Sequence, residues 1–157
     1  MANETQVAVL RRSVREWNQW RLGHRWAQVD LAGANFWGAD LSGVNLTNAD
    51  LRGTVFTGAN LRGAYLSRAN LQGAYLQGAT LTDARLDGAL LMDAMLCNAL
   101  LTQADLRRAN LQRADLRGAV LAAAACDQVC FVGTHLTHHQ LSAARSYQEA
   151  LLPDHLC

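Results

Sequence analysis

The stretch ALLMDAMLCNALL, from Ala89 to Leu101, decides the fold of this chain. On its own it is typical of a buried helix, because Ala, Leu and Met are strong helix formers. The stretch that follows, ADLRRANLQRADLRGAVL from Ala104 to Leu121, carries charges where the first is apolar. Both have a leucine at nearly every fifth residue and an alanine two residues before it. They are therefore one repeating pattern, and in the first stretch its outer positions have become apolar.

The five-residue frame extends over most of the chain. A large apolar residue recurs from Leu31 to Leu121, and Cys126 and Phe131 continue the series. A small residue, nearly always Ala, precedes each large one by two positions, up to Ala124. Such regularity indicates an architecture built from short repeated units.

The frame excludes an amphipathic helix. Five residues advance about 500° around a helix, so the leucines would spread around its axis. In an extended chain, residues two apart share a face, but an odd period turns every second unit outward. The chain must therefore turn at every unit and coil around an apolar axis. Glycines stand two residues after the large position, where tight corners are expected: Gly33, Gly38, Gly43, Gly53, Gly63, Gly73, Gly88 and Gly118.

The runs ADLSGVNLTNADLRG (39–53) and ANLRGAYLSRANLQGAYL (59–76) resemble the pentapeptide-repeat family, whose motif is A(D/N)LXX. The resemblance extends from about Val29 to Leu136 without an insertion. It implies an all-β solenoid, a right-handed quadrilateral β-helix of about five coils with four pentapeptides in each. We expect short α-helical caps at both ends, since an open terminal coil would recruit other strands.

The N-terminal cap is expected over residues 1–28, before a solenoid over 29–136. Asn3 and Gln6 form a capping signal for one helix from Glu4 to about Leu22. Its apolar stripe is Val7, Leu10, Val14 and Trp17.

The C-terminal cap is expected over residues 137–157. Thr137 and Gln140 suit a capping box, and Pro153 ends the helix. The residues expected on its apolar face are Leu141, Ala144, Tyr147 and Leu151.

Composition narrows the class of protein. The chain has 157 residues, a net charge of +1 and no apolar run long enough to span a membrane. Its start lacks the pattern of a signal peptide, so we expect a cytoplasmic protein. Its cysteines follow no disulfide framework and are expected to be free thiols: Cys97, Cys126, Cys130 and Cys157.

Catalytic and metal chemistry is weakly represented. Aspartates precede the inward leucine at Asp30, Asp40, Asp50, Asp105 and Asp115, where hydrogen bonding to the local backbone explains them better than acid–base catalysis. A cluster of possible zinc ligands consists of Cys126, Cys130, His135, His138 and His139. The spacing of these residues is not that of a zinc finger. Cys126 is expected at an inward position and Cys130 is expected to point outward. We expect no enzyme, no cofactor and no bound metal.

The N-terminal segment is rich in arginine and tryptophan: Arg11, Arg12, Arg15, Arg21, Arg25, Trp17, Trp20 and Trp26. One reading is a surface for phosphates or an anionic partner. A solvated face, with its tryptophans packed on the first coil, explains the pattern better.

An apolar belt at mid-rod is the candidate site. The position before each leucine is Asp or Asn near both ends but changes in the middle. The belt consists of Tyr75, Leu90, Met92, Met95 and Leu100. Exposed apolar patches tend to mark interaction sites, although tolerated surface variation is the alternative.

The expected function is a non-enzymatic interaction or regulatory scaffold, whose partner is another protein or a second copy. The alternative, which the resemblance implies, is a DNA mimic that binds gyrase or topoisomerase and protects against quinolones. A mimic needs a sustained negative field, whereas arginines nearly balance the aspartates between Val29 and Leu136. We expect no nucleic-acid partner.

Overall fold

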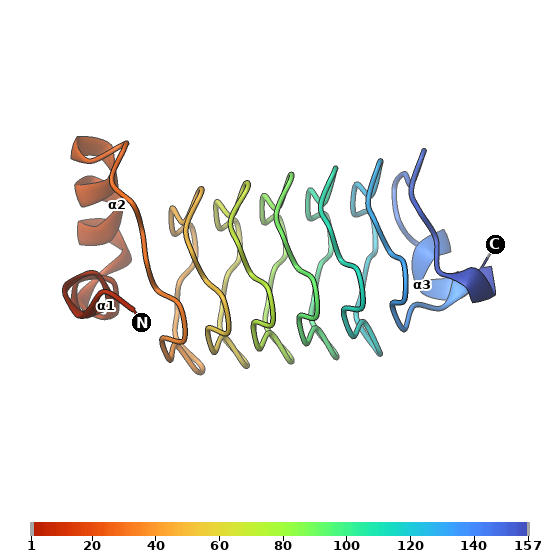
Figure 1. The fold of residues 1–157 in the computed structure, drawn as a ribbon, viewed down its shortest axis with the longest axis horizontal. Helices are drawn as coiled ribbons and strands as arrows, with labels where there is room; N and C mark the ends of the chain where they lie inside the picture. The colour runs from red at the N-terminus through yellow and green to blue at the C-terminus, as the bar shows by residue number, and fades with distance from the viewer. Residues whose placement is uncertain (1, 157) are drawn as a thin grey trace.

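The computed structural model describes residues 2–156 as a rod of stacked coils with helices at its ends (Figure 1). Helices α1 (Glu4–Arg12) and α2 (Val14–Gly23) lie at the N-terminal end. Helix α3 (His138–Ser142) and the short 3-10 helix η1 (Asp154–Leu156) lie at the other. No helix within residues 2–156 has both the length and the apolar character that crossing a membrane requires.

The rod is held together by parallel pairing between residues twenty positions apart. Asp50 pairs with Asn70 and Asn70 with Leu90, and three further columns repeat this spacing. Within one column, Leu71 N donates to Leu90 O at 2.7 Å and Leu90 N donates to Ala69 O at 2.9 Å. The β-structure consists of single paired residues because the chain turns after every pentapeptide. Four pentapeptides per coil give the rod four faces.

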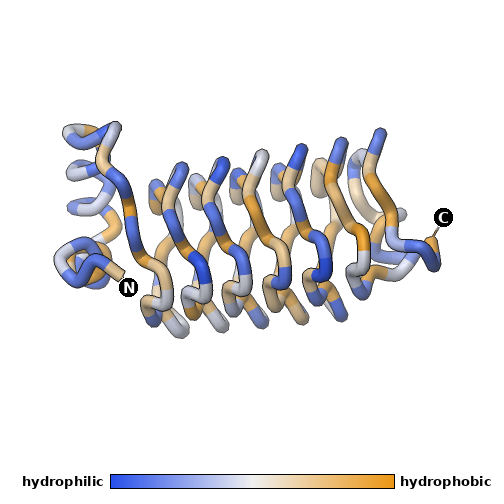
Figure 2. Tube along the Cα trace, viewed as in Figure 1, coloured by the Kyte–Doolittle hydropathy of each residue, from blue (hydrophilic) through white to orange (hydrophobic). Residues whose placement is uncertain are grey.

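The core is the ladder of leucines and alanines expected from the frame. Leu91, Leu96 and Leu101 are buried, and so are the alanines two residues before them. Figure 2 shows hydrophobic and hydrophilic residues interspersed along the coils of the rod. Each Leu–Ala unit places two apolar side chains on the axis, so the core is continuous along the solenoid.

The corners require a left-handed backbone. The residue two after the inward leucine has a positive φ, as in Gly88 at 66°, and a turn closes with Ala89 N donating to Leu86 O at 2.9 Å. In the C-terminal half many corners carry other residues, such as Arg113 and Ala123 at 58° and 56°. These side chains stand where glycine fits best.

The aspartates before the inward leucines support the turns, as expected. Asp50 Oδ1 accepts a hydrogen bond from Arg52 N at 3.2 Å, and Asp105 Oδ1 accepts one from Arg107 N at 3.2 Å. The same contact recurs at Asn60. These side chains satisfy backbone donors at the corners.

The N-terminal cap is two helices, so the prediction of one helix from Glu4 to about Leu22 is wrong. Ser13 has an extended backbone with φ −166° and ψ 126°. Its Oγ accepts a hydrogen bond from Glu16 N at 3.3 Å and starts α2. The capping role of Asn3 is confirmed, since its Oδ1 accepts from Gln6 N at 3.2 Å.

The C-terminal prediction is right for the capping box and wrong beyond Ser142. Thr137 and Gln140 cap α3 reciprocally. The chain then pairs with the last coil, with Ser146 beside Ala125 and Leu151 beside Cys130. The expected helical face therefore ends at Leu141, the only one of its four residues that is buried: Ala144 is half-buried, and Tyr147 and Leu151 are exposed. A partial coil satisfies the open backbone edge, which a longer helix would leave unpaired.

Candidate partner surface

The apolar belt lies on the outside of the rod. Four of its side chains are 39–42% exposed: Tyr75, Leu90, Met95 and Leu100. Met92, the fifth, is half-buried. The inside–outside assignment of the frame therefore holds for the stretch from Ala89 to Leu101.

The belt is divided among three faces. Leu90 pairs with Asn70 and Asn110, so it is an isolated apolar residue in a polar column. Met95 pairs with Tyr75, and Leu100 pairs with Val120, in two other columns. A partner with a flat surface contacts only one face at a time.

The column through Met95 carries the longest apolar stripe of the belt. Val55, Tyr75 and Met95 follow one another on three coils, joined by parallel pairing. Leu76 N donates to Met95 O at 2.8 Å, and Gln77 Nε2 lies 3.1 Å from Met95 Sδ. We call these three residues the Tyr75 stripe. The paired backbone fixes the side chains on a rigid sheet.

A shorter stripe lies on the next face. Leu100 pairs there with Val120, which is 40% exposed, and on its other side with Thr80. Sequence reasoning missed Val55 and Val120, although each stands twenty residues from a belt member. That spacing is the signal that would have found them.

Tyr65 is also exposed, on the fourth face. The guanidinium carbon of Arg85 lies 5.1 Å from the centre of its ring. This ring is therefore engaged by a cation rather than presented as an apolar surface.

The charged residues beside the stripes are paired. Arg117 binds Asp115 and lowers the pKa of its carboxyl well below the usual range. Arg113 binds Asp93 on the neighbouring coil, with Arg113 Nε 2.7 Å from Asp93 Oδ1. The other solenoid pairs are Arg52–Asp50, Arg107–Asp105 and Arg62–Asp83. Such pairing neutralises acids that a sustained negative field would need.

The arginines of the N-terminal helices serve partly as structural groups. Arg21 is buried, and its NH2 donates to Thr47 O at 3.0 Å. Arg11 NH2 donates to Asn35 O at 3.0 Å, and Arg12 pairs with Glu16. The remaining two, Arg15 and Arg25, are exposed.

The tryptophans of this segment do not behave alike. Trp17 is fully buried, and its Nε1 donates to Asn45 O at 2.8 Å. Trp20 is half-buried against the core. Trp26 is 98% exposed, so the expectation that the tryptophans pack on the first coil is wrong for this residue.

The candidate zinc ligands are not brought together. Cys126 occupies an inward position, and burial raises the pKa of its thiol to about 12. Cys130 is half-buried on the outside, as the frame predicts. Within residues 2–156, no three His, Cys, Asp or Glu side chains are grouped to hold a metal ion. Cys97, Cys126 and Cys130 are free thiols, and Cys157 lies outside the described residues.

Comparisons with known proteins agree with this architecture. The model of the pentapeptide repeat family matches residues 27–58, 59–103 and 99–137, with eight copies. The structure of Rfr23, a pentapeptide repeat protein from the cyanobacterium Cyanothece 51142, has a TM-score of 0.53 at 26% identity. That match covers 86% of this chain and 97% of Rfr23.

Two further structures are similar to parts of the chain. HetL, a pentapeptide repeat protein involved in heterocyst differentiation regulation in Nostoc sp. strain PCC 7120, is 31% identical over 74% of this chain, with a TM-score of 0.44. The chain spans 58% of HetL. QnrB1, a plasmid-mediated fluoroquinolone resistance protein, is 16% identical over 78% of this chain and 80% of its own, with a TM-score of 0.36. No curated protein gives a significant sequence match.

Proposed function

The chain belongs to the pentapeptide-repeat family, and from that premise we propose that it is a non-enzymatic scaffold that binds another protein through the Tyr75 stripe. Its fold is the right-handed β-helix of the family. The architecture we propose in detail is five coils of twenty residues, closed by helices at both ends. The twenty-residue pairing and the hydrogen bonds between the helices and the coils support it.

The stripe itself carries the proposal. Tyr75 and Met95 are exposed and adjacent on one face, and Tyr and Met are enriched where proteins meet. Because paired backbone holds both residues, a partner would not have to order a flexible loop. The flanking acids are neutralised by arginines, which lowers the cost of covering the face.

The partner is another protein or a second copy of this chain, and the site of action we propose is the cytoplasm. The three free thiols support a reducing compartment. A second copy would pair two such faces around a two-fold axis.

The experiment compares two double variants on neighbouring faces. Tyr75→Asn with Met95→Asn makes the stripe polar, and Leu100→Asn with Val120→Asn is the matched control. We measure self-association by sedimentation velocity, and partner capture by pull-down from native cell extract followed by affinity measurement on the captured protein. We expect the first variant to weaken association by more than about tenfold and the control to retain it.

Two results would contradict the proposal. If association survives in the first variant, the Tyr75 stripe is not the binding surface. If association is lost in the control alone, the binding surface is the face of Leu100. Met95→Asp with Leu100→Asp, which changes both faces together, should leave the circular dichroism of the rod unchanged because both side chains are exposed.

A further inference from the structure

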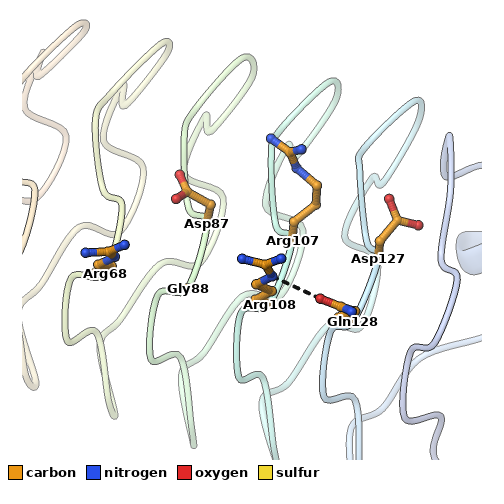
Figure 3. Close-up of a pocket in the computed structure, with 7 residues that line it drawn as sticks. All are labelled: Arg68, Asp87, Gly88, Arg107, Arg108, Asp127 and Gln128. Carbon is orange, nitrogen blue, oxygen red and sulfur yellow. Dashed lines mark hydrogen bonds between the residues drawn. The ribbon is translucent and has the colours of Figure 1, made fainter.

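One corner of the rod, away from the Tyr75 stripe, carries a row of stacked side chains. Arg68, Gly88, Arg108 and Gln128 follow at intervals of twenty residues, all with a positive φ. Figure 3 shows Gly88 between the two arginines along this row. The coils repeat at about 4.8 Å, so the two arginines start about 10 Å apart.

The two guanidinium groups of this row lack acidic partners. Arg68 makes no side-chain hydrogen bond or ion pair with any residue of the described chain 2–156. Arg108 Nε donates to Gln128 Oε1 at 2.9 Å and pairs with no carboxylate among these residues. Five other solenoid arginines are paired with aspartates. Arg85 has no acidic partner either, but its guanidinium lies against the ring of Tyr65. Arg68 and Arg108 therefore differ from the other solenoid arginines, because neither a carboxylate nor an aromatic ring holds them.

The nearest aspartates are occupied elsewhere. Asp87 accepts a hydrogen bond from Ser67 Oγ at 2.6 Å. Asp127 accepts hydrogen bonds from Ser146 Oγ at 2.7 Å and from the backbone of Gln148 at 2.9 Å. Figure 3 shows both carboxylates displaced to one side of the arginine row, together with Arg107. Both carboxylates line the same hollow as the arginines and keep their negative charge, but neither bonds to the guanidinium group of Arg68 or Arg108.

Gly88 keeps the space between the arginines open. This space is part of a hollow of about 410 Å³ that is also lined by Arg107, Asp87 and Asp127. A Cβ atom at Gly88 would lie 3.5 Å from Arg68 Cγ, so even a small side chain would reduce it. Glycine thus leaves a notch with a guanidinium on either side.

We propose that Arg68 and Arg108 hold a phosphate group in the notch above Gly88. A phosphate dianion offers three terminal oxygens, enough for a guanidinium fork on each side, whereas a carboxylate suits one fork. The phosphate is either a free anion or a monoester on a phosphorylated side chain, since both present the same oxygens. Binding strengthens above about pH 6, where the second proton of a phosphate monoester is lost.

The test follows the Nε–H resonances of Arg68 and Arg108 by NMR as inorganic phosphate is added at constant ionic strength. Saturable shifts at both arginines support the site. Shifts that grow linearly, or that sodium chloride reproduces, overturn it. A second titration uses N-acetyl-phosphoserine amide: tighter binding than inorganic phosphate identifies a phosphorylated side chain as the ligand, and equal or weaker binding identifies the free anion.

Matched variants separate a built site from general positive charge. Arg68→Ala with Arg108→Ala should weaken phosphate binding by more than about tenfold. Arg15→Ala with Arg25→Ala removes the same charge from the exposed N-terminal cap. This variant should change phosphate affinity by less than about twofold. Equal losses in the two variants would overturn the proposal.

The notch is tested without removing charge by Gly88→Asn. Asn occupies corners of the same type at Asn48 and Asn98, so the backbone accepts it. The control is Gly78→Asn, at a corner with open space around it. We expect phosphate binding to fall about fivefold or more in the first variant only. Unchanged binding in Gly88→Asn would show that the notch holds no anion.

Discussion

The side-chain amide of Asn18 in helix α2 bonds the backbone beside Asn45 of the first coil, where no neighbouring coil of the described chain is present to pair with it. Its Oδ1 accepts a hydrogen bond from Asn45 N at 2.8 Å, and its Nδ2 donates to Gly43 O at 3.0 Å. Gln6 does the same in α1, where Nε2 donates to Gln28 O and Oε1 accepts from Asp30 N, both at 2.9 Å. The cap therefore protects the open edge through side-chain amides.

Removal of these amides should destabilise the cap and expose the edge. In the variant Gln6→Leu with Asn18→Leu, we expect a loss of about 2–5 kcal/mol in the free energy of unfolding, because backbone donors and acceptors lose their partners. The exposed edge should also produce concentration-dependent oligomers. Urea titration and light scattering measure the two effects. Gln19→Leu, at an exposed position of α2, is the control, and equal behaviour would contradict the edge-capping role.

The left-handed corners predict a stabilising substitution. Ala123 has φ 56°, a conformation that costs an L-residue about 1–2 kcal/mol, more than the extra chain entropy of glycine. Ala123→Gly should therefore raise the free energy of unfolding by about 0.5–1 kcal/mol. Ala122→Gly, next to it and without a positive φ, should lower that energy by a similar amount. Thermal denaturation of both variants checks the sign, and a loss in both would contradict the corner argument.

The Asp115–Arg117 pair predicts an acid-side effect. The hydrogen bond from Arg117 lowers the pKa of Asp115 below its unfolded value of about 3.9, so the folded chain binds fewer protons than the unfolded chain as pH falls. The stabilisation is fully present above that value and is lost as pH decreases through the folded pKa. Carboxyl ¹³C NMR measures the titration directly. Arg117→Gln should return the pKa of Asp115 towards the ordinary range, and an unchanged value would contradict the assignment.

The buried thiol of Cys126 should be unreactive in the folded protein. Its pKa of about 12 leaves little thiolate at neutral pH, and the leucine ladder encloses it. In a variant that keeps only this cysteine, labelling should proceed at the rate of unfolding, whereas a variant that keeps only the half-buried Cys130 should label much faster. Elemental analysis should find no stoichiometric zinc. One equivalent of metal, or rapid labelling of Cys126, would contradict this placement.

Sequence predicts the solenoid well because its period is uniform. Leu91 and Met95 are assigned to the inside and outside by counting alone, and the twenty-residue coil then pairs Tyr75 with Met95. The stripe is complete only when Val55 is added by the same count. The notch at Gly88 is harder to foresee, because the pairing of neighbouring arginines depends on side-chain geometry.

The ends are less predictable because local signals compete there. Ser13 lies within an apolar stripe of helical spacing, yet its own capping contact with Glu16 interrupts the helix. Near the C-terminus, Ser146 stands beside Ala125 at a separation of twenty-one residues, so the five-residue frame no longer applies. Tyr147 and Leu151 then fit a helical face by spacing alone, although the backbone pairs with the last coil.

The sharpest test of the frame uses two adjacent leucines from the stretch at Ala89 to Leu101. Leu91 is 1% exposed and Leu90 is 39% exposed, so the same substitution removes the same atoms from opposite sides of the sheet. Leu91→Ala should cost about 2–5 kcal/mol, because it leaves a cavity among packed side chains. Leu90→Ala should cost less than about 1 kcal/mol, since water already reaches its side chain. Urea titration measures the free energy of unfolding of both variants. Equal losses would mean that the assignment of Leu91 to the inside and Leu90 to the outside is wrong.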